Sequence, residues 1–264
     1  MNKSPRPMPG TVNGLRHRVR GISLIELLIG LVIGLLIAIA AIGSLVFTKS
    51  SASVVGDTAR LQQDASTIMR LIGHHAREAG ARPVRNASSG EAAESNSNVQ
   101  FDTTYLGYST STFTELRAVD GSSNGTDTLG LSHSVDPAIQ VRDCLGTLPP
   151  SATTTSITND FSVVNGELRC QGMSSTASIA GGVEDFQVWY GVHTGDNMRY
   201  LIATNVVDWN AVDSILVCLR MSGETRSGDA ASPAMNGCNG ETVAADGRIR
   251  RVFRQVFTLR SSGL

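Results

Sequence analysis

The most prominent pattern in the chain is an apolar run near its amino terminus. From Leu27 to Phe47 there are 21 consecutive positions without a charged residue. At about 1.5 Å of rise per residue, a helix of that length spans roughly 30 Å, which is the thickness of a bilayer core. Glu26 lies at the start of this run. We therefore predict a membrane helix whose single carboxylate calls for a partner near the lipid boundary.

After Lys49 the pattern becomes amphipathic without a turn signal. Apolar residues follow steps of three, four or seven, which is the spacing of one helix face. They are Val54, Leu61, Ala65, Ile68, Ile72 and Ala76. One continuous helix from about Ile22 to Ala79 is predicted, ending at Gly80 with Pro83 shortly beyond.

In the remainder the period changes to two, which is typical of strands. We expect strands at residues 129–135, 161–170, 186–192 and 214–221, with an Asn165-Gly166 hairpin turn inside the second. Residues 86–125 are rich in Ser, Asn, Gly and Thr, and predict a long exposed connection with short strands near 101–106 and 114–118. The predicted fold class is α+β, with the long helix packed on an antiparallel sheet.

The carboxy-terminal stretch is open to two interpretations. Ile249, Val252, Phe253, Val256 and Phe257 fit a helical stripe, but their aromatic and β-branched content favours a strand. We expect a helical turn that leads into a strand at about 253–260.

The amino-terminal pattern resembles the class III signal of type IV prepilins. The matching positions are Gly21, Ile22 and Glu26, which follow a leader containing five basic residues. The resemblance implies that a prepilin peptidase cuts after Gly21 and methylates Ile22. The new ammonium would then lie about one helical turn from Glu26, so that the acid of one chain can meet the amine of a neighbour. A secretory signal cut near Ala38-Ile-Ala40 and a plain signal anchor are the alternatives.

Within this superfamily the later motifs resemble the PilW minor pilins. These motifs are Arg77-Glu-Ala-Gly80, Gly125-Thr-Asp127-Thr-Leu129, Cys144-Leu-Gly, Leu168-Arg-Cys170, residues 182–191, Asp208-Trp209 and Arg250-Arg-Val-Phe253. The resemblance implies a minor pilin that helps to prime and cap a type IV pilus. Its implied partners are other minor and major pilins, the prepilin peptidase, the inner-membrane assembly platform and membrane lipid. A type II secretion minor pseudopilin and a tip adhesin or DNA-binding module are the alternatives.

Charge predicts the topology of the chain. The leader contains Lys3, Arg6, Arg16, Arg18 and Arg20, and its removal leaves 17 basic against 23 acidic residues, a net charge of −6. Such a chain has no general attraction for nucleic acid. Basic residues stay cytoplasmic, so we expect a single membrane pass with everything after Phe47 exported. The resemblance implies an inner-membrane protein with a periplasmic head that later joins an extracellular pilus. The expected parts are the leader (1–21), the helix (22–80, of which 22–47 span the membrane) and the head (81–264).

Small residues and cysteines predict two further contacts. Gly30, Gly34 and Ala38 recur every four residues and would let a second helix approach closely. Four cysteines in the exported part predict two disulfides, with three possible connectivities. We favour the sequential pairs Cys144–Cys170 and Cys218–Cys238, because each closes a polar stretch.

No catalytic constellation stands out, and we expect no enzyme activity, cofactor or metal. Ser132, His133 and Asp136 are triad types, but neighbours on one strand point to opposite faces. His74 and His75 diverge by about 100° on a helix, which argues against a shared metal. The stretch from Asp120 to Leu131 lacks the final Glu of a calcium loop and indicates an ordinary turn. The arginines near the carboxy terminus are expected to be solvated charges on an edge strand, where they oppose aggregation. They are Arg248, Arg250, Arg251, Arg254 and Arg260.

Overall fold

The computed structural model describes most of the chain from Gly21 to Leu259. The described ranges are residues 21–81, 84–86, 99–101, 116–121, 125–135, 141–149, 156–195, 197–226 and 232–259. The chain divides into two compact units, Met1–Lys49 and Ser50–Leu264. The leader, the connection that was expected at 86–125, and Arg260 lie partly or wholly outside the described residues.

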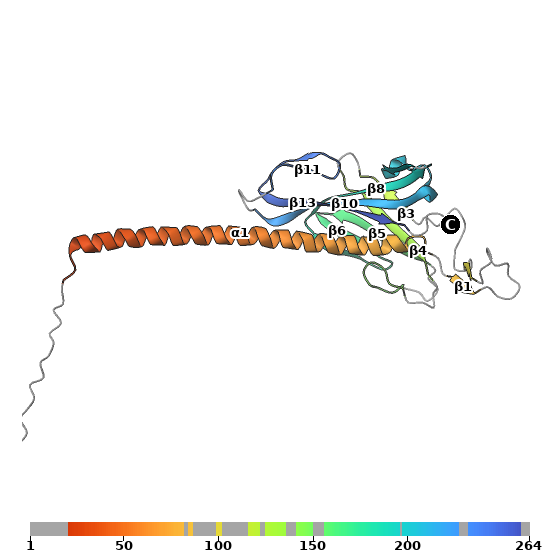
Figure 1. Cartoon of the computed structure of the whole chain (residues 1–264). Helices are drawn as coiled ribbons and strands as arrows, with labels where there is room; N and C mark the ends of the chain where they lie inside the picture. Colours follow the sequence, from red (N-terminus) through yellow and green to blue (C-terminus); the bar gives the residue numbers. More distant parts are fainter. Residues whose placement is uncertain are drawn as a thin grey trace, which may run out of the picture. The chain divides into compact units, whose positions relative to one another are not determined.

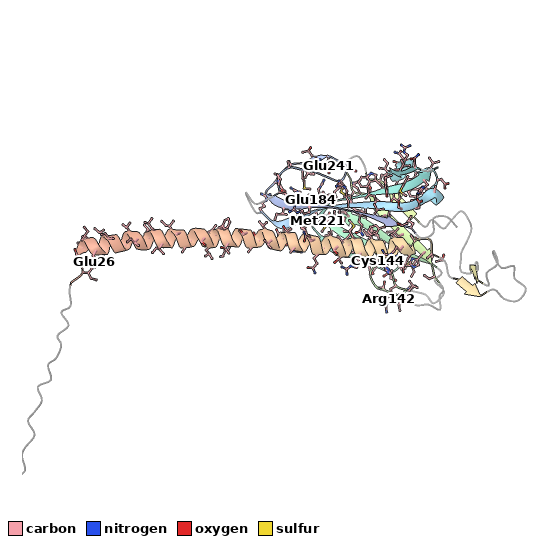
Figure 2. All side chains as sticks on the ribbon, in the orientation of Figure 1. Glu26, Arg142, Cys144, Glu184, Met221 and Glu241 are labelled. Carbon is pink, nitrogen blue, oxygen red and sulfur yellow. A yellow bond between two sulfur atoms is a disulfide. The ribbon has the colours of Figure 1, made fainter. Side chains whose placement is uncertain are left out.

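Helix α1 (Leu24–Glu78) contributes to both units and is the predicted long helix. In the first unit its large apolar side chains stand out on all sides (Figure 2) and are 51–79% exposed between Leu24 and Phe47. A helix that is apolar all round needs lipid or other helices around it. By length and composition α1 is able to cross a membrane.

The end of α1 follows from a glycine. Gly80 adopts a φ of +72°, a conformation that an L side chain rarely takes, and it directly follows the last turn. The amide of Ala79 still donates to the carbonyl of His75, at 2.9 Å. The predicted end of the helix at Gly80 is therefore confirmed.

In the second unit α1 supplies one apolar face to the core. Five residues of the predicted stripe are 4% exposed or less; they are Leu61, Ala65, Ile68, Ile72 and Ala76. The sixth, Val54, is half-buried and packs against the same core. They belong to one cluster with residues from both larger sheets, such as Leu131, Phe161, Phe186 and Ile215. Burial of these side chains, at about 1.5–3 kcal/mol each, is the main force that holds helix and sheets together.

In the part of the chain that the structure describes, the strands form two larger sheets and two short ribbons (Figure 1). Each hydrogen-bonded pair among these strands is antiparallel. The order β3-β4-β5-β6-β7 defines the five-stranded sheet and β13-β10-β8-β9 the four-stranded sheet. The ribbons are β1-β2 and β11-β12. The bounds are β1 (Val84–Asn86), β2 (Val99–Phe101), β3 (Leu116–Val119), β4 (Thr128–Ser134), β5 (Ser156–Val164), β6 (Glu167–Gln171), β7 (Thr176–Gly181), β8 (Val183–Thr194), β9 (Asn197–Leu201), β10 (Val212–Arg226), β11 (Met235–Asn236), β12 (Thr242–Val243) and β13 (Arg248–Thr258). Two short 3-10 helices, η1 (Ala203–Asn205) and η2 (Trp209–Ala211), lie between β9 and β10.

The predicted hairpin turn joins β5 to β6. Asn165 and Gly166 have φ values of 54° and 76°. Positive φ at both central residues is the requirement of a type I′ turn, whose twist matches that of the flanking strands. The α+β fold class and the main strands are thus confirmed.

One local expectation was wrong. β13 runs as a strand from Arg248 to Thr258, so the helical turn expected before Phe253 is absent; pairing with β10 along its length outweighs the helical spacing of the apolar residues.

The strand β4 is buried at every position from Leu129 to Ser134. β4 lies inside the sheet between β3 and β5, and Ser132 Oγ there donates to Thr158 Oγ1 at 3.1 Å.

Candidate assembly site

Ile22 and Glu26 lie close together in the sequence, at the beginning of α1. Glu26 lies in the first helical turn, and the amide of Leu27 donates to the carbonyl of Ser23 at 3.1 Å. Ile22 precedes the helix and is 74% exposed. A carboxylate in the first turn is favoured by the helix dipole, and it is available to a cation outside the chain.

The small-residue stripe on α1 is open to a neighbour. A methyl group added at Gly30 or Gly34 would meet no atom within 4 Å. No contact inside the described part of the chain therefore requires glycine at these two positions. The close approach of a second helix at Gly30, Gly34 and Ala38 stays a prediction.

Two disulfides tie loops of the head to its sheets. Cys144 pairs with Cys170 of β6, and Cys218 of β10 pairs with Cys238. This is the sequential connectivity that we favoured. Figure 2 labels Cys144 in the loop after β4.

The loop around Cys144 is organised by the carboxylate of Asp143. Its Oδ1 accepts from the amides of Leu145 and Thr147, at 3.0 and 2.9 Å, and its Oδ2 accepts from the amide of Met173, at 3.0 Å. Burial opposes the charge, but these bonds and one from the Thr147 hydroxyl hold the pKa of Asp143 below its usual range. This role could not be predicted from the sequence, because Met173 is distant along the chain.

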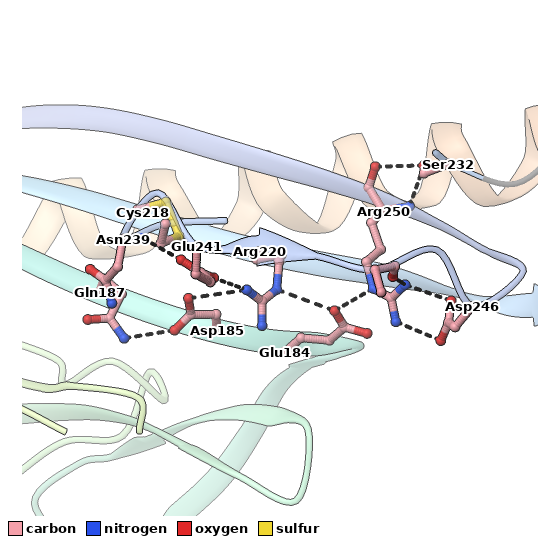
Figure 3. A network of polar contacts seen from close by, with 12 residues as sticks. Glu184, Asp185, Gln187, Cys218, Arg220, Ser232, Asn239, Glu241, Asp246 and Arg250 are labelled. Carbon is pink, nitrogen blue, oxygen red and sulfur yellow. Dashed lines mark hydrogen bonds and ion pairs between the residues drawn. A yellow bond between two sulfur atoms is a disulfide. The ribbon is translucent and has the colours of Figure 1, made fainter. Parts of the chain in front are cut away.

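A network of acids and arginines covers one end of the four-stranded sheet (Figure 3). Arg250 of β13 donates through Nε to Glu184 of β8 at 2.7 Å, and through Nη1 and Nη2 to both oxygens of Asp246 at 2.6 Å each. Arg220 of β10 lies 3.4 Å from the same Glu184 carboxylate and also bonds Glu241. The network thus holds the loop with β11, β12 and Cys238 to the sheet.

The charges of this network move the pKa values of its acids. The bonds from Arg250 lower the pKa of Asp246 to about 2. For Glu184 burial raises the pKa, but hydrogen bonds from Arg250 and Ser222 outweigh it and the net pKa is lowered. The expectation that all these arginines are solvated guards was therefore wrong for Arg250, which is 9% exposed. β13 is nevertheless an edge strand, as expected, and Arg251 and Arg254 are exposed.

The stretch that was compared with a calcium loop uses its carboxylates for backbone contacts. Asp120 accepts from the amides of Ala203 and Thr204, at 2.9 and 2.7 Å. Asp127 accepts from the amides of Gly121 and Val188, at 2.9 and 2.8 Å. Burial, the largest influence, raises the pKa of Asp127 despite these bonds. The carboxylates of Asp120 and Asp127 thus join this stretch to neighbouring elements, while residues 122–124 of the predicted turn lie outside the described residues.

The two histidines at the end of α1 both lie near Glu78, which the sequence reasoning did not consider. His74 Nε2 is 3.6 Å from Glu78 Oε1, and His75 Nδ1 is 3.5 Å from Glu78 Oε2. The expectation that His74 and His75 share no ion considered the two rings alone and left out the acid. The spacings of four and three residues to Glu78 were the signal that could have found it.

Two family models match the chain. Residues 155–261 match the family described as type IV pilus-assembly protein W, PilW. Residues 16–42 match the prokaryotic N-terminal methylation motif, which includes Gly21, Ile22 and Glu26. A search of the curated proteins returned no match.

Solved structures resemble the chain at low sequence identity. A type IV-like pilin from Thermus thermophilus shares 14% identity with a TM-score of 0.46, covering 78% of this chain and 98% of its own. A chain of the GspK-GspI-GspJ complex from the type 2 secretion system of enterotoxigenic Escherichia coli shares 12% identity with a TM-score of 0.35. That match covers 73% of this chain and 95% of the other.

The two family models match two regions that also stand out in the structure. One is the acid-bearing start of an apolar helix, and the other is the head from β5 to β13. Residues 155–261 thus resemble the PilW pilus-assembly family, and residues 16–42 resemble the prokaryotic N-terminal methylation motif, in a chain that combines a long helix with antiparallel sheets.

Proposed function

We propose that this chain is a minor pilin that enters a type IV pilus through α1 and takes part in priming and capping the filament. The observation that carries the proposal is Glu26, a single acid in the first turn of a helix whose next 21 residues are uncharged. A lone carboxylate at the lipid boundary is costly unless a cation neutralises it. In a stack of such helices, that cation is the amino terminus of the adjacent subunit.

The proposal assigns each amino-terminal residue a role. Gly21 is the residue before the cleavage, Ile22 becomes the methylated terminus, and Glu26 sets the register between subunits. Gly30, Gly34 and Ala38 form the face along which helices pack. Before assembly the chain waits in the inner membrane with its leader in the cytoplasm and its head in the periplasm.

Substitution at Glu26 tests the register. Glu26→Ala is expected to leave cleavage intact and to lower incorporation into pili, because the partner amine loses its counter-charge. Glu26→Asp is the matched control, since it keeps the charge, and it should retain most of the incorporation. The measurements are the amount of this chain in sheared pili and the number of pili per cell. Wild-type values for the alanine variant would contradict the register.

The amino terminus itself is tested by mass spectrometry of the membrane-extracted chain. A first residue Ile22 with an added methyl group is expected. A first residue near Ala40, or an intact leader, would contradict the processing. A type II secretion pseudopilin is the second candidate; deletion of the gene would then abolish secretion and leave pilus number unchanged.

A further inference from the structure

A groove of about 680 Å³ runs between α1 and the edge strand β13. It is lined by residues between 62 and 77 of the helix and between 252 and 257 of the strand, all within the second unit. The residues at its base are buried or half-buried; they are Ala65, Met69, Gly73, Phe253 and Phe257. The base of the groove is therefore largely apolar.

Ser232 covers the first part of the outer edge of β13. Its amide donates to the carbonyl of Arg248 at 3.1 Å. Its hydroxyl accepts from the amide of Arg250 at 2.8 Å and donates to the carbonyl of the same residue at 3.1 Å. Ser232 thus bonds to backbone groups of β13 that point away from β10.

Beyond Arg250 the outer edge continues without a partner in the described part of the chain. Successive residues of a paired strand direct their amide and carbonyl alternately to one side and the other. Those of Arg250 point outward to Ser232, and the amide of Leu259 donates inward to Asp213 of β10 at 2.8 Å. The register with β10 is unbroken from Arg250 to Thr258. The residues that direct their backbone groups outward are therefore Val252, Arg254, Val256 and Thr258.

The rim of the groove is basic. The described residues that line it include three arginines, Arg70, Arg77 and Arg254, and no acid. Arg254 donates through Nη2 to the carbonyls of Gly237 and Cys238, at 2.9 and 3.4 Å. The side chains of Arg70 and Arg77 are exposed and make no ion pair or hydrogen bond with another described residue. Unpaired cations gather here although the chain without its leader has 17 basic against 23 acidic residues.

The spacing of the helix arginines fits the repeat of a strand. Arg70 and Arg77 are two turns apart, which is about 10 Å along the helix axis. Alternate residues of a strand, whose side chains share one face, are about 7 Å apart. The long arginine side chains can span this difference, and each guanidinium can donate two hydrogen bonds to one carboxylate.

We propose that an extended, acidic segment of a partner protein lies in this groove and pairs with β13 from Val252 to Thr258. It would become the fifth strand of the four-stranded sheet. In this mode of recognition, main-chain hydrogen bonds supply affinity and alternate side chains supply specificity. Acids on the face of the added strand toward α1 would pair with Arg70 and Arg77.

Charge and hydrogen bonding favour this occupant over two others. A second copy of this chain that paired its β13 antiparallel about Val252 and Phe253 would place Arg251 opposite Arg254, and like charges in that position repel. Phosphate groups of a nucleic acid would match the arginines, but they only accept hydrogen bonds and offer no donor to the outward carbonyls of β13.

Binding of a synthetic strand to the full chain in detergent tests the groove. The probe is a fluorescein-labelled peptide of alternating valine and glutamate, and fluorescence anisotropy measures its binding. It should bind more than about tenfold more tightly than the same peptide with lysine in place of glutamate, because lysine meets arginine with like charge. A peptide with proline in place of valine should also bind more weakly, since proline has no amide for the ladder. Absence of binding, or equal binding of either altered peptide, would overturn the proposal.

Arginine variants locate the peptide. Arg70→Gln and Arg77→Gln should each weaken its binding by more than about fivefold, and their unfolding temperatures should match that of the wild type because both side chains are exposed. Arg199→Gln is the matched control, since Arg199 is exposed on β9 at the other edge of the same sheet. Wild-type binding by both groove variants, or an equal loss in the control, would overturn the assignment.

Hydrogen exchange tests the strand pairing directly. Bound peptide should slow exchange at the outward amides of β13 and leave β9 unchanged; unchanged exchange on β13 would overturn the proposal. An oligothymidylate is the last probe, and it should not bind. Its binding in place of the peptide, with loss in Arg70→Gln, would assign the groove to nucleic acid and overturn the proposal. These readouts need no pili, so they succeed or fail separately from the register set by Glu26.

Discussion

At the scale of single residues, the head depends on charges whose partners come from distant strands. Arg250 joins Glu184 of β8 to Asp246 of the loop before β13, and its side chain is 10% exposed. The guanidinium group of an arginine is a planar set of donors, and in this position these donors match the two carboxylates. Its removal takes the nearer of two counter-charges from the partly buried Glu184 and leaves Arg220, which is 3.4 Å away.

Arg250→Gln should destabilise the head by about 1–3 kcal/mol, between the values for exposed and buried ion pairs. The measurement is chemical denaturation at pH 7. Arg199→Gln, on the exposed strand β9, is the matched control and should change the free energy of unfolding by less than about 0.5 kcal/mol. Equal effects of the two substitutions would show that the network adds nothing specific.

The network also predicts how stability depends on pH. Glu184 and Asp246 have folded-state pKa values below their ordinary values of 4.5 and 3.8, and that of Asp246 is about 2. Groups of this kind contribute stability above the unfolded pKa and lose it as the pH falls through the folded pKa. The unfolding temperature should therefore fall from about pH 4.5 toward pH 2, and fall less steeply in Arg250→Gln. The same slope in both chains would exclude the network as its source.

At the scale of elements, α1 and the four-stranded sheet pack at a glycine. A methyl group at Gly73 would lie 2.5 Å from Cε1 and 2.8 Å from Cδ1 of Phe257 on β13. Phe257 is 5% exposed and belongs to the core. The glycine therefore sets how closely helix and strand approach.

Gly73→Ala should destabilise the head by about 1–3 kcal/mol, because the ring has to move within a packed core. Gly56→Ala is the matched control on the same helix, since a methyl group there meets no atom within 4 Å. It should stabilise the helix by about 0.5–1 kcal/mol through helix propensity alone. Denaturation curves of both variants measure the difference, and a neutral Gly73→Ala would show that Phe257 yields without cost.

At the scale of the whole molecule, the chain consists of a unit whose apolar helix is able to cross a membrane and a unit with its own core. Core residues of the second unit begin with Val54 and Leu61 on α1 and continue to Leu259. Its two disulfides are typical of an exported domain. Large apolar side chains of the first unit are exposed throughout.

A chain that starts at Ser50 should therefore remain in solution as a folded protein, while the full chain sediments with membranes. The reason is that residues 50–264 contain the core and the disulfides, and residues 22–47 contain the apolar surface that needs lipid. Carbonate extraction of membranes and circular dichroism of the shorter chain measure the two outcomes. A shorter chain that aggregates unfolded would mean that the head depends on the first unit.

Several features of the sequence determine local structure by themselves. These features act over short distances in the chain, where backbone geometry and solvation decide the outcome. They are the charge-free run, the helical stripe to Ala76, the Asn165-Gly166 turn and the spacing of the cysteines. The strand pattern also predicted β8 and β10. On β13 the same reasoning failed, because pairing on a sheet depends on elements far away in the sequence.

Tertiary structure alone decided which polar groups meet. Asp143 with Met173, Arg250 with Glu184, and Asn159 with His75 are separated by 30, 66 and 84 positions. Whether a residue lies in the core or on the surface depends largely on the hydrophobicity of its own segment. Burial can therefore be predicted from the sequence. Hydrogen bonds and ion pairs need particular atoms within about 3 Å of each other, and only the folded chain brings them there.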